Sequence, residues 1–273
     1  MNVEIEAGTG IAVNPDAMTE RANRHLVDML SVTNVQTEVT PHFAFQNFLP
    51  AEIYALMDRF WPGDGFFESL NDSALVRTRR PEFENKYSSN RLEEPLGELS
   101  AQLPCEAAVV FWHWLVGWLK SDFVARAVLE RLSDPEISKE AALAVKDLIL
   151  DTLETEVVLQ EDREGCSLPV HRDSDLKVVS MILYIARPTD PDRFGTRVYQ
   201  LKRSTILDLR EGKIRLVGYN PFDYFDEVFA APYRPNSGFV FLNNSQLWHG
   251  VREIDQPDAC RRVLLWNLVH PRG

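Results

Sequence analysis

The chain has 273 residues, of which 45% are hydrophobic and 26% charged, and its formal net charge is −12. This length and composition suit a globular protein with one large domain or two small ones. An acidic surface of this strength repels polyanions, so nucleic acid is excluded as an expected partner. The three cysteines are scattered and form neither a disulfide framework nor a C-x-x-C pair for zinc.

The sequence carries no signal for export or for a membrane. Residues 1–18 are acidic and lack the apolar segment of a signal peptide. The most apolar stretch, residues 107–119, is too short to cross a bilayer and is typical of a buried helix. Because the few thiols also fit a reducing compartment, we expect a cytoplasmic protein without membrane contact. The oligomeric state is left open, with a homodimer as one arrangement.

Helical periodicity dominates the first half of the chain. This periodicity predicts helices over 16–31, 51–60 and 105–132. A short strand is expected within 41–50, before the second of them. Ser133 and Glu136 have the spacing of a capping box, which predicts a further helix that begins after Ser133 and runs to about Leu153. The aromatic and charged segment 66–92 is expected to be a loop with little regular structure.

From residue 154 the pattern changes to short runs of β-branched and aromatic residues. These runs are TEVVLQED, LKVVSMILYIA, TRVYQLK, GFVFLNN, WHGVREI and RRVLLWNLVH. Strands that follow a helical half predict an α+β protein with a jelly-roll (double-stranded β-helix) core in the C-terminal half, flanked by N-terminal helices. We expect one domain over 1–273. Residues 1–153 would give helical support and a substrate loop, and 154–273 the core with its metal site.

Three residues have the pattern of a metal site. His171 and Asp173 form a His-x-Asp pair before a hydrophobic run, and His249 follows a second strong run. Alternate residues of a strand point the same way, so the pair is expected to share one strand and face one ion. Two imidazoles and one carboxylate are the facial triad that binds Fe(II) and leaves other positions open. The remaining four histidines read as structural.

Two arginines begin the last predicted strand, twelve and thirteen residues after His249. A planar guanidinium binds a carboxylate through two hydrogen bonds, so either Arg261 or Arg262 could hold an acidic ligand. Arg261 shares its strand face with Asn267, and this more polar face favours Arg261 as the inward residue. The alternative for each of the two arginines is an exposed charge at the end of a strand, without a ligand.

These motifs in this order resemble the Fe(II)/2-oxoglutarate-dependent oxygenase superfamily, and more narrowly its bacterial prolyl-4-hydroxylase-like branch. The resemblance rests on HRD at 171–173, GTRVY at 195–199, WHGV at 248–251, RRVLLWN at 261–267 and the upstream PHFAFQNFLPAEIYALMDRFWP. It runs from about Pro41 to Val269 and is thin between 62 and 104. One departure is Asp162, which stands where many relatives carry a tyrosine. Tyr184 and Tyr199 are candidates to replace that tyrosine, with core packing as the alternative.

The resemblance implies an enzyme that uses Fe(II), 2-oxoglutarate and O2 to hydroxylate an unactivated C–H bond, with release of succinate and CO2. The implied metal ligands are His171, Asp173 and His249. The residues implied to hold 2-oxoglutarate are Arg261 or Arg262, Tyr184 and Asn267. Related halogenases lack the carboxylate ligand, so Asp173 favours hydroxylation, desaturation or ring closure over chlorination.

The substrate is expected to be a small metabolite, anionic or amino-acid-like. Basic residues gather at 77–91, where a loop could fold over the barrel and hold a carboxylate or phosphate; a surface patch paired with glutamates is the alternative. The candidate substrate residues are Arg77, Arg79, Arg80, Arg91 and Trp248. Three other functions stay open: a hydroxylase of protein or carrier-tethered side chains, a cupin-type metal enzyme without 2-oxoglutarate, and a non-catalytic binding module.

Overall fold

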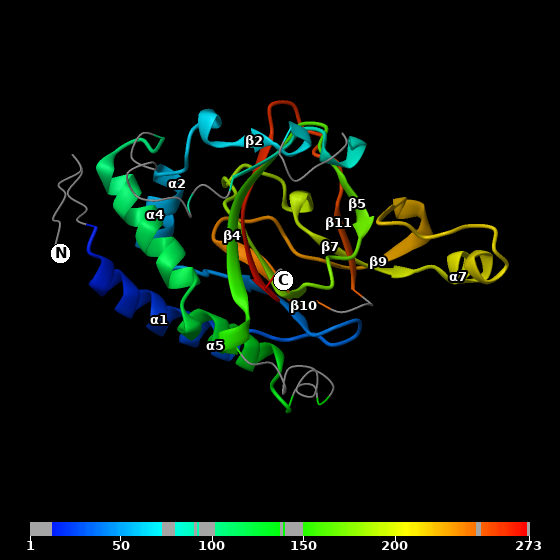
Figure 1. The fold of residues 1–273 in the computed structure, drawn as a ribbon, viewed down its shortest axis with the longest axis horizontal. Helices are drawn as coiled ribbons and strands as arrows, with labels where there is room; N and C mark the ends of the chain where they lie inside the picture. The colour runs from blue at the N-terminus through cyan, green and yellow to red at the C-terminus, as the bar shows by residue number, and fades with distance from the viewer. Residues whose placement is uncertain are drawn as a thin grey trace.

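A computed structural model describes residues 13–72, 80–89, 92, 102–136, 139, 150–243 and 247–271 of the chain. Two antiparallel sheets form the centre of the molecule, and helices cover one side of the larger sheet (Figure 1). These helices are α1 (Pro15–Val32), α2 (Ala51–Arg59), α4 (Glu106–Leu119) and α5 (Asp122–Leu132). The short helix α7 (Arg203–Arg210) projects at the far side. Within the described ranges, no helix has the length and apolar character needed to span a bilayer.

The strands lie in two sheets of different size. Their bounds are β1 (His42–Gln46), β2 (Glu68–Ser69), β3 (Lys86–Ser89), β4 (Glu154–Arg163), β5 (Leu168–His171), β6 (Lys177–Tyr184), β7 (Arg197–Leu201), β8 (Tyr219–Asn220), β9 (Phe225–Ala230), β10 (Ser237–Leu242), β11 (Trp248–Val251) and β12 (Cys260–Val269). The larger sheet has the order β1-β10-β6-β12-β4-β3-β2, and the smaller has the order β8-β5-β11-β7-β9.

Eight of these strands form a jelly roll. β4, β6, β10 and β12 lie in the larger sheet, and β5, β7, β9 and β11 lie in the smaller one. Two such sheets, joined by connections that cross between them, are the arrangement of a jelly roll. The predicted α+β class with a jelly-roll core in the C-terminal half is therefore confirmed.

The larger sheet separates two apolar cores. On β12, Leu264 and Trp266 face the helices, whereas Val263 faces the smaller sheet, as the alternation of a strand requires. Trp266 is fully buried, and its indole Nε1 donates to the carbonyl of Leu119 at the end of α4 at 2.7 Å. Burying one such large apolar side chain contributes about 1.5–3 kcal/mol, and this contact fixes the helical layer to the sheet.

The long helix expected over 105–132 is two helices. α4 ends at Leu119, and the hydroxyl of Ser121 donates to the carbonyl of Trp118 at 2.6 Å before α5 begins. The capping-box prediction is also wrong. Ser133 is the C-cap of α5, and its hydroxyl donates back to the carbonyl of Leu129 at 2.6 Å. The backbone N–H of Glu136, which a capping box would direct to Ser133, donates instead to Oδ1 of Asp134 at 2.9 Å. Most of the helix predicted after it lies outside the described residues.

The segment 66–92 has more regular structure than its sequence predicts. In its described part, β3 pairs with the edge of β4 from Lys86 opposite Asp162 to Ser89 opposite Leu159. β2 then pairs with β3, and at the other edge of the sheet β1 pairs with β10. Strands from the N-terminal half therefore extend the larger sheet on both sides of the jelly roll.

Candidate active site

Two histidines of the smaller sheet face each other inside the jelly roll. His171 ends β5 and His249 lies on β11, where the two are direct cross-strand partners. Their ring centroids lie 4.2 Å apart. One nitrogen of each ring and one carboxylate oxygen of Asp173 all lie within 4.8 Å of one another, which is close enough for one ion to contact all three.

Asp173 reaches this point from a loop, which corrects the expectation that it shares a strand with His171. β5 ends at His171, and Asp173 lies two residues later in the connection to β6. Strand alternation therefore does not orient its carboxylate. Two residues of β6 orient it instead, because the hydroxyl of Ser180 donates to Oδ2 at 2.9 Å and the ammonium of Lys177 donates to Oδ1 at 3.1 Å.

The protonation states of the three side chains fit a divalent metal ion. Burial, reinforced by the neighbouring His171, lowers the pKa of His249 to about 3, and burial likewise lowers the pKa of His171. Nδ1 of His171 lies 3.0 Å from the carbonyl of Pro169, so Nδ1 carries the proton and Nε2 keeps its lone pair. Burial opposes the ionisation of Asp173, but Lys177 and the histidines hold its pKa below the ordinary value. At neutral pH the set is two neutral imidazoles and one carboxylate.

A cavity of about 210 Å³ opens beside these three residues. Its polar walls include Lys86, Gln160, Lys177, Thr196, Arg261 and Asn267. Its apolar walls include Ile182, Phe241 and Leu265. The candidate metal ligands and a group of cationic side chains therefore share one small space.

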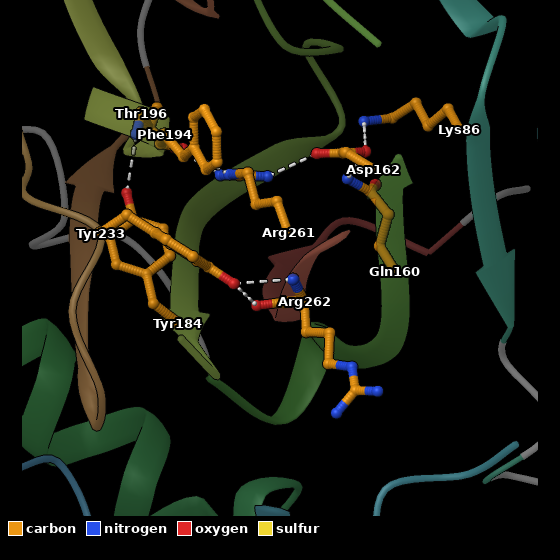
Figure 2. Close-up of polar contacts among 9 residues, drawn as sticks. All are labelled: Lys86, Gln160, Asp162, Tyr184, Phe194, Thr196, Tyr233, Arg261 and Arg262. Atoms are coloured by element: carbon orange, nitrogen blue, oxygen red, sulfur yellow. Dashed lines mark hydrogen bonds and ion pairs between the residues drawn. The ribbon is translucent and has the colours of Figure 1, made fainter. Parts of the chain in front are cut away.

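Arg261 points into this cavity, whereas Arg262 points away from it (Figure 2). Arg261 is 2% exposed, and its Nε donates to the carbonyl of Phe194 at 2.6 Å while Nη2 donates to Oγ1 of Thr196 at 3.3 Å. Arg262 lies on the helix side of the strand, where its guanidinium is 5.6 Å from the ring centroid of Trp61. The orientation follows the alternation predicted for the last strand, and Asn267 shares the inward face.

Asp162 lies between two buried cations (Figure 2). Nη1 of Arg261 donates to its Oδ2 at 2.6 Å, and Nζ of Lys86 donates to its Oδ1 at 2.8 Å. The amide of Gln160 donates to the same Oδ1 at 2.8 Å. Burial alone would raise the pKa of Asp162, but the two cations lower it, so the carboxylate stays ionised.

Tyr184 and Trp248, two of the predicted ligand-binding residues, do not line the cavity. The hydroxyl of Tyr184 accepts a hydrogen bond from the amide of Thr196 at 2.9 Å, which fixes the residue directly before β7 (Figure 2). Trp248 packs against Phe225 with ring centroids 5.2 Å apart, on the far side of β11 from the cavity.

Of the basic residues at 77–91, the structure describes Arg80. Its guanidinium lies 5.7 Å from the ring centroid of Phe83, a residue that lines the cavity. Arg77, Arg79 and Arg91 lie outside the described residues. Lys86 and Lys177 also line the cavity but are not predicted from the sequence, because a single lysine gives no local signal that it faces a site.

No protein-family model and no curated protein matches this chain. Comparison with solved structures finds distant similarities. A prolyl-4-hydroxylase from Pseudomonas putida is 15% identical over 92% of this chain and 99% of its own, with a TM-score of 0.43. A prolyl hydroxylase from Trichoplax adhaerens, solved with a peptide fragment of hypoxia inducible factor, is 10% identical over 93% and 91%, with a TM-score of 0.49.

A third similar structure is HygX from Streptomyces hygroscopicus, solved with nickel, 2-oxoglutarate and hygromycin B. It is 13% identical over 85% of this chain and 84% of its own, with a TM-score of 0.38. Because all three similarities are this distant, the function of the chain has to be inferred from its own residues.

Proposed function

We propose that this protein is a non-haem Fe(II)- and 2-oxoglutarate-dependent oxygenase that hydroxylates a small anionic substrate. The observation that carries the proposal is the presence of a two-histidine, one-aspartate set and a buried inward arginine in one cavity. With O2, the bound iron and 2-oxoglutarate would supply the oxidation of an unactivated C–H bond, and succinate and CO2 would be released.

His171, Asp173 and His249 would hold the iron by one face. The cross-strand pairing of the two histidines sets their separation before any ion arrives. Ser180 and Lys177 fix the carboxylate in the same way, so little rearrangement is needed on binding. Such support by surrounding hydrogen bonds is what gives a metal site its geometry.

Arg261 would bind the far carboxylate of 2-oxoglutarate. Its contacts to Phe194, Thr196 and Asp162 use three of the five N–H groups of a guanidinium and hold it in one orientation. Within the described part of the chain, the other two N–H groups are left for a ligand in the cavity. The apolar walls beside them limit water, which strengthens a charge-assisted hydrogen bond.

The size and charge of the cavity support a small anionic substrate. A volume of about 210 Å³ is below the roughly 300–1,000 Å³ of pockets for drug-sized ligands. Among the described residues, three cations line it, Lys86, Lys177 and Arg261, whereas the carboxylates beside them are Asp162 and Asp173. A divalent ion and a dianionic co-substrate cancel each other, so this excess of one positive charge would remain for an anionic group of the substrate.

An anaerobic titration of Fe(II)-loaded protein with 2-oxoglutarate tests the proposal through the weak visible charge-transfer band of the chelate. His249→Ala should abolish the band, whereas His113→Ala, at an exposed position of α4, should leave it unchanged. Arg261→Met should raise the 2-oxoglutarate concentration needed for half-saturation by about 10- to 100-fold, and Arg262→Met should not.

If folded wild-type protein binds iron but shows no charge-transfer band, 2-oxoglutarate is not its co-substrate. A metal enzyme of another kind, or a binding module, would then take its place. A band together with succinate release that is stimulated only by peptides would keep the oxygenase and overturn the small-molecule substrate.

A further inference from the structure

We propose that Lys86 is a second cation for the far carboxylate of the co-substrate, and that Asp162 is a built-in counter-ion shared by Lys86 and Arg261. Lys86 comes from β3, a strand outside the jelly roll. The inference rests on the proposed function, because it assumes that 2-oxoglutarate binds beside Arg261.

The three side chains form a row across three adjacent strands. Lys86 on β3 is the direct partner of Asp162 on β4, and Asp162 is the direct partner of Arg261 on β12. Direct partners on neighbouring strands point to the same side of a sheet, with Cβ atoms roughly 5 Å apart. The register of the sheet therefore places both cations on the inner face, one on each side of the carboxylate (Figure 2).

The cavity is lined by the two cations but not by the carboxylate between them. Lys86 and Arg261 both line the cavity, and Asp162 does not. All three are buried, with Lys86 5% and Asp162 1% exposed. One carboxylate balances one of two buried positive charges, so a single positive charge is left facing the cavity. A buried cation is costly unless a counter-charge or ligand accompanies it, and a ligand carboxylate would meet that need.

Hydrogen-bond donors are also left over in the row. The ammonium of Lys86 donates to Asp162, which uses one of its three N–H groups. Arg261 uses three of five in its contacts with the described residues. The two side chains together thus retain donors for both oxygens of a second carboxylate, whereas Asp162 already accepts from Lys86, Gln160 and Arg261.

Calorimetric titration of the Ni(II)-loaded protein with two acids tests this role. One acid is 2-oxoglutarate. The other is 2-oxopentanoate, which has the same chain length and the same metal-chelating end but a methyl group in place of the far carboxylate. The ratio of the two dissociation constants isolates what the protein gains from the far carboxylate, independently of turnover.

Lys86→Met should weaken the binding of 2-oxoglutarate by about 10- to 100-fold, the loss expected for one charge-assisted hydrogen bond, and should change the binding of 2-oxopentanoate by less than about threefold. Lys86→Arg should keep most of the preference. Lys202→Met, at the start of α7, is the matched control and should change neither constant.

The double variant Lys86→Met, Asp162→Asn removes one charge of each sign and should recover part of the lost affinity, because it restores the single positive charge of the row. The double variant also leaves Arg261 without its counter-charge. Lys86→Gln, which keeps the ion pair of Arg261 with Asp162, therefore keeps the test open if Lys86→Met does not fold. Thermal unfolding of each variant without metal checks the fold.

Wild-type protein that binds neither acid would overturn the proposed function itself. Wild-type preference for 2-oxoglutarate that survives Lys86→Met unchanged, or a loss that is equal for both acids, would overturn the role of Lys86 while the oxygenase stands. A double variant as weak as Lys86→Met would overturn the role of Asp162 as a counter-charge.

Discussion

Replacing Arg261 by methionine should destabilise the metal-free protein through the loss of three buried contacts. The guanidinium holds Asp162, the carbonyl of Phe194 and the hydroxyl of Thr196. Breaking a buried ion pair from one side costs roughly 3–5 kcal/mol, but Asp162 keeps Lys86 and Gln160, so the lower end applies. A loss of about 3 kcal/mol would lower the Tm by about 6–12 °C in a chain of this size.

Arg262→Met is the neighbouring control, measured by urea and thermal unfolding at pH 7. The side chain of Arg262 is 23% exposed, and its Nε lies 3.6 Å from Oε1 of Glu161, which Arg163 and Trp61 also contact. A partly exposed pair of this kind contributes about 0–1 kcal/mol. Equal losses of unfolding free energy in the two variants would refute the reasoning that Arg261, and not Arg262, forms the buried ion pair.

The difference in the free energy of unfolding between Arg261→Met and the wild type should also become smaller in acid. The folded-state pKa of Asp162 is below its ordinary value, because Lys86 and Arg261 outweigh the effect of burial. A carboxyl with a lowered folded pKa stabilises the fold above its unfolded pKa of about 4 and loses that contribution as the pH falls below it. An unchanged gap between pH 7 and pH 3.5 would show that the ionised carboxylate is not the source of the difference.

Three further predictions concern other positions. His42 is 2% exposed and burial lowers its pKa, so the wild type loses stability as the pH falls through about 6.5. In urea unfolding, the free energy of unfolding of His42→Phe should rise by about 1 kcal/mol relative to that of the wild type between pH 8 and pH 5, and a constant difference would contradict this. Lys177→Met removes the ammonium 3.1 Å from Oδ1 of Asp173, and with it a positive charge that repels the metal ion. Calorimetry should therefore show Ni(II) binding that is about three- to tenfold tighter, whereas weaker binding would mean that Lys177 mainly positions the carboxylate. Gly238→Ala would place a Cβ 2.3 Å from a backbone oxygen of β6 and should cost about 3 kcal/mol or prevent folding, while Gly117→Ala, with open space around it on α4, should stabilise by about 0.5–1 kcal/mol in the same thermal assay.

The jelly roll could be predicted because its strands carry the signal of burial. In β6 and β10 nearly every residue is buried, and both were visible as apolar β-branched or aromatic runs. β3 has the sequence KYSS and forms because the edge of β4 offers backbone groups to pair with, which no local pattern records. The break between α4 and α5 was missed because the apolar spacing continues across it, while Ser121 ends the first helix.

Part of the candidate site could likewise be predicted from the sequence, and part depends on the fold. The residue types and spacing of His171, Asp173 and His249 predicted a metal site, and strand alternation predicted which arginine faces inward. The loop position of Asp173 and the contact of Lys86 with Asp162 depend on segments that are distant in the sequence. Asp162 was recognised as a departure from the family pattern, but its meaning required the register of three strands.

The position of β12 has a consequence for the order in which the protein can assemble. Among the described residues β12 is the last strand, yet it lies in the middle of the larger sheet, hydrogen-bonded to β4 on one side and β6 on the other. While a ribosome is still translating this strand, β4 and β6 have no partner between them, and Arg261 has not reached Asp162. Nascent chains should therefore expose apolar sheet edges until β12 has emerged from the ribosome, a period in which a chaperone would be of most use.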